Sequence, residues 1–310
     1  MRRAVIEVER LTKRYGQLMA VDCISLKVFE GEVFSLLGPN GAGKTTTVEI
    51  LEGLRPPTSG EAYVLGHDVR DPGQLKALKR RIGVLPQAFE AFERLTVLEN
   101  LKLIAAAYGA SQDLRPLLEN WGLWEFRNTL YDKLSGGLKR RLGIAMALVG
   151  EPELVFLDEP TSGLDPYARR EVWRLVGELR GKGKTVFLTT HYIEEAERLS
   201  DRVCIMNRGR IAALGKVEEL IAAQGLGSRL VIRGLSPEQE AALEGLGSRP
   251  IRLEDGSLLL SGLTLQRAAA ALALLQELGF RGTAEVTQGS LEEAFLRIVG
   301  HRLTEAGELA

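Results

Sequence analysis

The sequence lacks the features of several large classes of protein. It has two cysteines in 310 residues, Cys23 and Cys204, and their placement fits neither a disulfide framework nor a metal site. No apolar run approaches the roughly 18 residues of a membrane-spanning helix; residues 268–275 are among the longest. Glu7 comes too early for a secretory signal. We therefore expect reduced, packed thiols, and any path through a membrane must come from another polypeptide.

The chain carries almost equal numbers of basic and acidic residues. Lys and Arg number 40 against 41 Asp and Glu, which gives a formal net charge of −1. A chain this neutral offers no whole-protein footprint for nucleic acid and no polybasic membrane anchor. Its hydrophobic share of 45% and charged share of 26% are those of an ordinary globular protein, and its length favours about two domains.

Strand-like and helix-like segments alternate along the first 220 residues. A helical stretch begins at Lys44, directly after an apolar run, and helical spacing returns between residues 96 and 127. The predicted strands are 4–8, 25–28, 33–37, 154–157, 185–189 and 203–206. Alternation of this kind predicts an α/β fold with a mainly parallel sheet and a ligand at the carboxyl ends of its strands.

A second domain is predicted after a glycine-rich linker at 224–228. We expect residues 1–224 to form the nucleotide-binding domain and residues 229–310 an accessory domain. The second segment reads as β-α-β-β-α-β followed by a helix, and Asp255-Gly256 is a hairpin signal between two of its strands. That order predicts a small α+β domain of ferredoxin-like type.

Residues 38–45 read Gly-Pro-Asn-Gly-Ala-Gly-Lys-Thr and match the phosphate-loop pattern in full. Glycines let consecutive main-chain N–H groups point at phosphate oxygens, Lys44 adds a positive charge, and the Thr45 hydroxyl can bind Mg²⁺. A chance match in a glycine-rich turn is disfavoured by the strand before it and the helix after it. The predicted nucleotide-binding residues here are Gly38, Pro39, Asn40, Gly41, Ala42, Gly43, Lys44, Thr45 and Thr46.

Asp158 and Glu159 stand at the end of the apolar strand 154–157. Two acids at a strand end could simply face solvent. In a chain that also has a phosphate loop, a second interpretation is stronger. We expect Asp158 to hold Mg²⁺, through water, and Glu159 to act as the general base on the attacking water.

Leu134-Ser135-Gly136-Gly137 lies between the phosphate loop and the two acids. Together these motifs resemble the ATP-binding cassette (ABC) ATPases over nearly all of residues 4–220. The resemblance implies a P-loop fold with antiparallel strands and a helical subdomain. It also implies a head-to-tail homodimer, in which the Ser135 hydroxyl and the N–H groups of Gly136 and Gly137 bind the γ-phosphate of the other subunit's nucleotide. Leu138 stands where most members have glutamine.

The same resemblance assigns further residues. Tyr15 falls where the family has an aromatic side chain that stacks on adenine, and Gln87 where a glutamine reaches the metal. Residues 162–165 match the segment that crosses the dimer interface, and His191 matches the histidine that contacts the γ-phosphate. A lone tyrosine or histidine is more often part of a core, so these assignments depend on the order of the motifs.

Two C-terminal segments, 195–202 and 290–296, look like drug- and lipid-exporter cassettes such as the daunorubicin-resistance ATPases. This resemblance implies an ATPase with ATP and Mg²⁺ as cofactors. It would power export through a separate integral-membrane permease, as a peripheral protein on the cytoplasmic face of the membrane. No nucleic-acid partner is expected.

Two alternatives remain open. The first is a non-transport ABC ATPase that acts on ribosomes or DNA; such proteins usually carry two cassettes or long coiled coils, and neither is evident in this sequence. The second is a nucleotide-binding regulator without turnover, which is disfavoured because Asp158, Glu159 and His191 are all present. The sequence does not indicate which substrate is transported.

Overall fold

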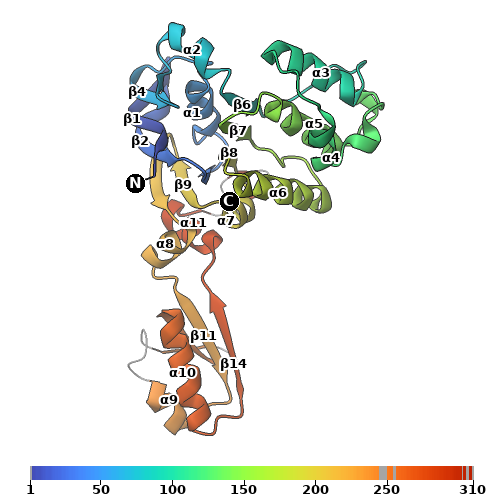
Figure 1. Ribbon diagram of the computed structural model, residues 1–310. Coiled ribbons are helices and arrows are strands. Elements are labelled where there is room, and N and C mark those ends of the chain that lie inside the picture. The colour runs from blue at the N-terminus through green and yellow to red at the C-terminus, as the bar shows by residue number, and fades with distance from the viewer. Residues whose placement is uncertain (1, 244–249, 254–255, 302, 305–306, 309–310) are drawn as a thin grey trace. The chain divides into compact units, whose positions relative to one another are not determined.

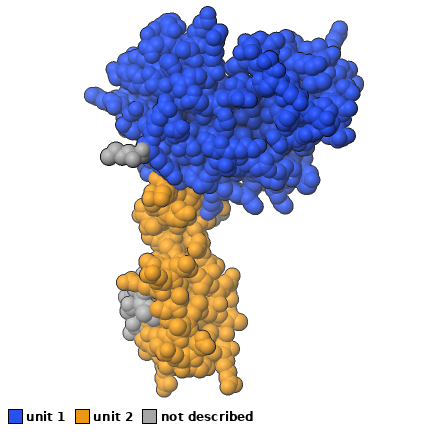
Figure 2. Space-filling model, in the orientation of Figure 1, with its two compact units in different colours: residues 1–214, 303–310 blue, residues 215–302 orange. Residues whose placement is uncertain are grey.

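The computed structural model describes residues 2–243, 250–253, 256–301, 303–304 and 307–308 (Figure 1). The chain forms two compact units, coloured separately in Figure 2. The first comprises Met1–Leu214 together with Leu303–Ala310, and the second comprises Gly215–Arg302. Among the described residues, no helix is long and apolar enough to cross a membrane.

A six-stranded sheet organises the first unit, with strand order β10-β9-β3-β8-β7-β6. The pairs β9–β3, β3–β8, β8–β7 and β7–β6 are parallel. Every residue of β3, β7 and β8 is buried, as expected for parallel strands covered on both faces. The strands are β3 (Val33–Leu37), β6 (Ile82–Leu85), β7 (Leu154–Asp158), β8 (Thr185–Thr190), β9 (Arg202–Asn207) and β10 (Arg210–Gly215).

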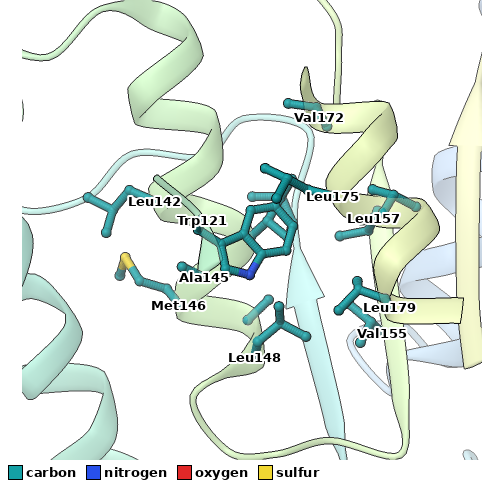
Figure 3. Close-up of a cluster of buried hydrophobic side chains, with 14 of the residues drawn as sticks. Trp121, Leu142, Ala145, Met146, Leu148, Val155, Leu157, Val172, Leu175 and Leu179 are labelled. Atoms are coloured by element: carbon teal, nitrogen blue, oxygen red, sulfur yellow. The ribbon is translucent and has the colours of Figure 1, made fainter. Parts of the chain in front are cut away.

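Successive side chains of these strands enter two different cores, because side chains alternate across a sheet. Val155 and Leu157 of β7 pack into one core, and Phe156 between them packs into the other. Figure 3 shows the first core, where Trp121 and residues of α5 and α6 surround Val155 and Leu157. In the second core the Phe156 and Phe187 rings lie 5.5 Å apart. The sheet is thus fixed from both sides.

An antiparallel sheet of order β2-β1-β4-β5 completes the strands of this unit. Its members are β1 (Ala4–Tyr15), β2 (Leu18–Phe29), β4 (Ser59–Val64) and β5 (His67–Asp68). β1 and β2 are each 12 residues long, whereas the sequence predicted only the short segments 4–8 and 25–28. Register shifts at several points of the β1–β2 pairing interrupt the alternation of buried and exposed residues, and the apolar Leu18 and Met19 are themselves exposed, so the strand pattern is hidden.

The helices of the first unit include a group inserted between β6 and β7. Thr96 and Glu99 form a capping box at the start of α3. This inserted group is the predicted helical subdomain, and with the two sheets it confirms the predicted fold class. The helices are α1 (Lys44–Leu51), α2 (Pro72–Leu78), α3 (Val97–Tyr108), α4 (Arg115–Asn120), α5 (Gly136–Leu148), α6 (Pro166–Gly181) and α7 (Ile193–Leu199), with short 3-10 helices at Trp124–Phe126 and Tyr131–Lys133.

The second unit has its own sheet, of order β12-β13-β11-β14, with antiparallel neighbours throughout. Its order along the chain, β-α-β-β-α-β, is the predicted ferredoxin-like arrangement. Asp255 of the predicted hairpin turn lies outside the described residues. The elements are α8 (Val217–Ala223), β11 (Ser228–Arg233), α9 (Pro237–Leu243), β12 (Ile251–Arg252), β13 (Leu258–Leu263), α10 (Leu265–Glu277), β14 (Thr283–Gln288) and α11 (Leu291–Val299).

The boundary between the two compact units lies at Leu214–Gly215, before the predicted linker at 224–228. α8 precedes that linker but packs against α11, and the Arg297 guanidinium donates to the carbonyl of Gln224. The independence of residues 1–224 as a folding domain stays a prediction.

We expect a chain that ends at Gln224 to fold and to bind ATP. The apolar core of the second unit shares no residue with the cores of the first. The truncation also removes residues 303–310 of the first unit, but none of the described residues of that segment belongs to either core, so both cores stay intact. Thermal unfolding and equilibrium binding of a fluorescent ATP analogue would measure this. As a control in the full chain, Leu230→Ala should destabilise the second unit by about 2–5 kcal/mol without changing ATP affinity. A folded 1–224 chain that cannot bind ATP would contradict the prediction.

Candidate nucleotide-binding and hydrolysis site

The carboxyl ends of three parallel strands meet at one edge of the six-stranded sheet. Leu37 at the end of β3 pairs with Thr190 of β8, and Asp158 at the end of β7 pairs with Thr189. The N–H of Glu159 also donates to the Thr189 carbonyl at 3.1 Å. This register brings the phosphate loop, the two acids and the histidine after β8 to the same place.

The phosphate loop needs glycine where the main chain comes close to other segments. A Cβ at Gly43 would lie 2.3 Å from the carbonyl oxygen of Ala20, and Gly43 also has a φ of +100°. A Cβ at Gly38 would lie 2.4 Å from the carbonyl oxygen of Met206. A side chain at either position would therefore displace the loop from the sheet edge.

Lys44, the first residue of α1, is held inside the loop. Its Nζ donates to the carbonyl of Gly38 at 2.8 Å and lies 3.7 Å from Glu159 Oε1. Burial lowers the pKa of Lys44, while the charges of Glu159 and Asp158 oppose that shift. The buried ammonium is thus placed where it can meet phosphate oxygens.

Glu159 lies between three polar side chains. Its Oε1 is 3.1 Å from His191 Nδ1, and its Oε2 accepts a hydrogen bond from Gln87 Nε2 at 3.4 Å. Burial alone would raise the pKa of Glu159, but the hydrogen bond and charge of His191 and the charge of Lys44 outweigh it and lower the pKa. The side chain is therefore held as a carboxylate, which is the form that a general base requires.

Asp158 is paired with two threonine hydroxyls. The Thr189 hydroxyl donates to Asp158 Oδ1, and Thr45 also hydrogen-bonds to this carboxylate. Burial raises the pKa of Asp158, and the hydrogen bonds from the two threonines oppose that rise. A hydroxyl next to a carboxylate is a donor set that suits Mg²⁺, which shares its shell with water and substrate phosphates.

A cavity of about 360 Å³ opens over the loop, and we call it the phosphate-loop cavity. Tyr15, 38% exposed, lines this cavity, and Lys13 Nζ lies 5.1 Å from the centre of its ring. The cavity thus joins a polar floor to an aromatic ring, as ATP requires. Its lining is Tyr15, Leu18, Met19, Ala20, Asn40, Gly41, Gly43, Lys44, Thr45, Thr46, Gln87 and Glu159.

Nine of the predicted site residues therefore line one cavity. Asp158 and His191 are connected to it through Thr45 and Glu159. The remaining predicted loop residues, Gly38, Pro39 and Ala42, shape the loop without lining the cavity. The role of each residue toward nucleotide stays a prediction.

Residues 134–137, which we call the signature segment, lie away from the phosphate-loop cavity. Ser135 caps α5, and its Oγ accepts a hydrogen bond from the N–H of Leu138 at 3.4 Å. Ser135 and Gly136 are exposed, and neither they nor Gly137 line the phosphate-loop cavity. Gly136 instead lines a separate hollow with Ser162 and other residues. Within one chain, the signature does not complete the site.

Sequence reasoning missed several residues at this edge. Thr189 bonds to both acids, and Arg140 of α5 donates to main-chain carbonyls beside them. The N–H of Asn40 donates to the carbonyl of Gly307 at 2.6 Å, so the C-terminal segment also reaches the loop. Thr189 could have been inferred from its place two residues before His191. The other two contacts join segments far apart in the sequence and leave no local signal.

The loop after a parallel strand and the acids at the end of another define a P-loop nucleotide hydrolase. A family profile described as ABC transporter matches residues 21–162. The chain is 37% identical to Nod factor export ATP-binding protein I of Paraburkholderia xenovorans, covering 98% of this chain and all of that one. It is 38% identical to the daunorubicin/doxorubicin resistance ATP-binding protein of Streptomyces peucetius, covering 96% of this chain and 92% of that one.

A solved dimeric ATP-binding cassette, bound to ADP and phosphate after hydrolysis, aligns with a TM-score of 0.62 and 30% identity, over 68% of this chain and 98% of that one. The chain belongs to the ATP-binding proteins of the ABC transporter family. It is an ATPase, as the sequence predicted.

Glu52, the C-cap residue directly after α1, is a buried acid close to the site. It is 4% exposed, and its Oε1 has no hydrogen-bond partner among the described residues. Burial, followed by the charges of Asp158 and Glu49, raises the pKa of Glu52 to about 8. Between about pH 5 and 8 the folded chain therefore holds a proton that the unfolded chain has lost, and stability falls as the pH rises through this window.

We expect Glu52→Gln to remove this loss, because glutamine keeps the shape of the side chain without a titrating charge. The variant should be more stable than the natural chain at pH 8, by an amount on the order of a few kcal/mol, with little difference near pH 5. Urea unfolding across this range would measure it. Glu119→Gln, at an exposed position of α4, should leave the pH dependence unchanged. An equal slope for Glu52→Gln and the natural chain would contradict the prediction.

Proposed function

We propose that two copies of this chain bind two ATP molecules head to tail, and that hydrolysis powers export through a separate integral-membrane permease. The observation that carries this proposal is the separation of the signature from the phosphate-loop cavity in the same chain. Ser135 is exposed at the start of α5, where its hydroxyl and the helix N-terminus can face a second subunit. The dimeric solved cassette supports the same arrangement.

The named relatives support a role in export and an ATPase that is separate from the permease. One is named for export of a Nod factor and the other for resistance to daunorubicin and doxorubicin, and both match over more than nine-tenths of their length. Both are named as ATP-binding proteins, which fits a subunit that works with a separate permease. This supports peripheral attachment to a permease, in preference to action on ribosomes or DNA.

The chemistry follows from the charges around Glu159. Lys44 and His191 lower the pKa of Glu159, so it is ionised and can accept a proton from water. Thr45 and Asp158 would hold Mg²⁺, with Gln87 reaching the same space. Bound there, the ion would neutralise the charge on the phosphate oxygens. Tyr15 offers its ring to the adenine, and the loop N–H groups and Lys44 hold the phosphates.

We expect Glu159→Gln to lower ATP turnover by about 100- to 10,000-fold, the usual contribution of a general base. Glutamine keeps the hydrogen bonds of the side chain but cannot accept the proton, so ATP stays bound and the dimer should persist. Phosphate release and size-exclusion chromatography with ATP would measure the two effects. Glu125→Gln, at an exposed position, is the control. Near-normal hydrolysis by Glu159→Gln would remove Glu159 as the base.

Sharing of the site between subunits can be tested by mixing. Lys44→Ala and Ser135→Arg each inactivate both sites of a homodimer, but their heterodimer contains one unaltered site. Random pairing should restore up to about a quarter of the natural activity if the two sites work independently. The control mixes Lys44→Ala with the double variant Lys44→Ala/Ser135→Arg, which leaves no unaltered site. If the first mixture is no more active than this control, the site is not shared.

A further inference from the structure

One guanidinium joins α5, which begins at the signature segment and which we call the signature helix, to the two acids at the end of β7. Arg140 lies on α5, five residues after Ser135, and its Nη2 donates to the carbonyl of Asp158 at 2.7 Å and also to that of Glu159. Its Nε donates to the carbonyl of Pro160 at 2.8 Å. Three successive main-chain carbonyls are therefore bound by a single side chain.

The same guanidinium also reaches the loop that carries the predicted metal-contacting glutamine. Arg140 Nη1 lies 3.3 Å from the carbonyl oxygen of Gln87 and 3.5 Å from that of Pro86. Glu159 and Gln87, whose side chains meet in the phosphate-loop cavity, thus have their main chains held by one residue. A fork of five N–H donors can make such contacts, whereas a lysine ammonium cannot.

Glu159 needs such support because its main chain is strained. Its φ of +47° is in the left-handed region, which costs a residue other than glycine on the order of 1–3 kcal/mol. Its N–H is held by the carbonyl and the hydroxyl of Thr189, and its carbonyl by Arg140 and the N–H of Ser162. The conformation that aims the carboxylate at the cavity is therefore fixed on both sides.

The electrostatics favour carbonyl binding over an ion pair. Arg140 is half-buried, and burial lowers its pKa, while the charges of Asp158, Glu195 and Glu159 oppose that shift. The guanidinium donates to main-chain oxygens and leaves the Glu159 carboxylate to face Lys44 and His191. Arg140 thus holds the base in place without taking up the oxygen atoms that would accept the proton.

We propose that Arg140 is a positioning residue for ATP hydrolysis, which fixes the main chains of Glu159 and Gln87 and couples both to the signature helix. The inference rests on the proposed role of Glu159 as the base. It adds a structural connection, within one chain, between the signature segment and the proposed base. When Ser135 at the start of α5 binds the partner's nucleotide, any shift of this helix moves the same guanidinium that holds this chain's own base.

Two substitutions separate positioning from simple stabilisation. Arg140→Met keeps the apolar stem and removes the donors, and Arg140→Lys keeps the charge but not the fork. Misplacing a catalytic group by about 1 Å costs about 100-fold in rate, so we expect a loss of that size in kcat for Arg140→Met and a smaller loss for Arg140→Lys. The KM and the affinity for a fluorescent ATP analogue should stay within about threefold, since no lining residue of the cavity changes.

A double-substitution cycle tests whether Arg140 acts through Glu159. Once Glu159→Gln has removed the base, adding Arg140→Lys should lower the residual rate little further, because interacting residues are not additive. Full additivity of the two losses would overturn the proposal. Arg174→Met, which removes an exposed guanidinium of α6 that pairs only with Glu171 and Glu178 among the described residues, is the matched control and should leave kcat unchanged.

The outcomes are distinct from those that test the proposed function. A natural chain without ATPase activity would refute the proposed function itself. An active natural chain, whose Arg140→Lys variant keeps the full kcat, would overturn only the role of Arg140. If Arg140→Met does not fold, or if Arg140→Lys loses ATP affinity and thermal stability in parallel with kcat, Arg140 supports the fold rather than the position of the base, and the proposal is wrong.

Discussion

The pairing of β7 with β8 is the constraint on which the site depends. Parallel register sets Asp158 beside Thr189, and one further main-chain bond ties Glu159 to the same threonine. A shift by one residue would turn the acids to the opposite face of the sheet. Such a shift is opposed by both apolar cores, because it would also exchange Phe156 with its neighbours Val155 and Leu157. Packing on both faces of the sheet therefore fixes the geometry of the site. The residues of the two cores do not themselves belong to the catalytic groups.

At this edge of the sheet, burial and the neighbouring groups shift the pKa values of the ionisable side chains in opposite directions. Burial disfavours the charged forms of Lys44 and Asp158, and it acts on Glu159 in the same direction. Yet Glu159 has a lowered pKa, because His191 and Lys44 act on it together. For Asp158 burial outweighs the hydrogen bonds from the two threonine hydroxyls and the weaker effect of the Lys44 charge, so its pKa is raised. Two adjacent acids thus differ in their proton affinity: Glu159 is held ionised, and the buried charge of Asp158 is one that a bound cation would neutralise.

Much of this site could be predicted from the sequence, because its parts are local motifs. The phosphate loop reads directly as eight residues, and the paired acids follow an apolar strand. The alternation of strands and helices and the order of elements in the second unit could also be predicted from apolar periodicity, whereas the helical subdomain was implied by the family resemblance. The long hairpin of β1 and β2 was not predicted in full, because register shifts interrupt its alternation of buried and exposed residues. Arg140 and Gly307 could not be identified from the sequence, because each matters only through a contact that the fold creates.

Arg140 shows why residues of this kind cannot be identified from sequence motifs. Its neighbours on α5 are charged and half-buried as well, so composition does not distinguish it. What distinguishes it is the direction of its hydrogen bonds, toward the carbonyls of a turn whose first residue has a positive φ. A strained residue persists only where its surroundings determine it on every side. The strain at Glu159 and the donors of Arg140 are therefore two aspects of one arrangement, and the signature helix is part of the structure that holds the proposed base.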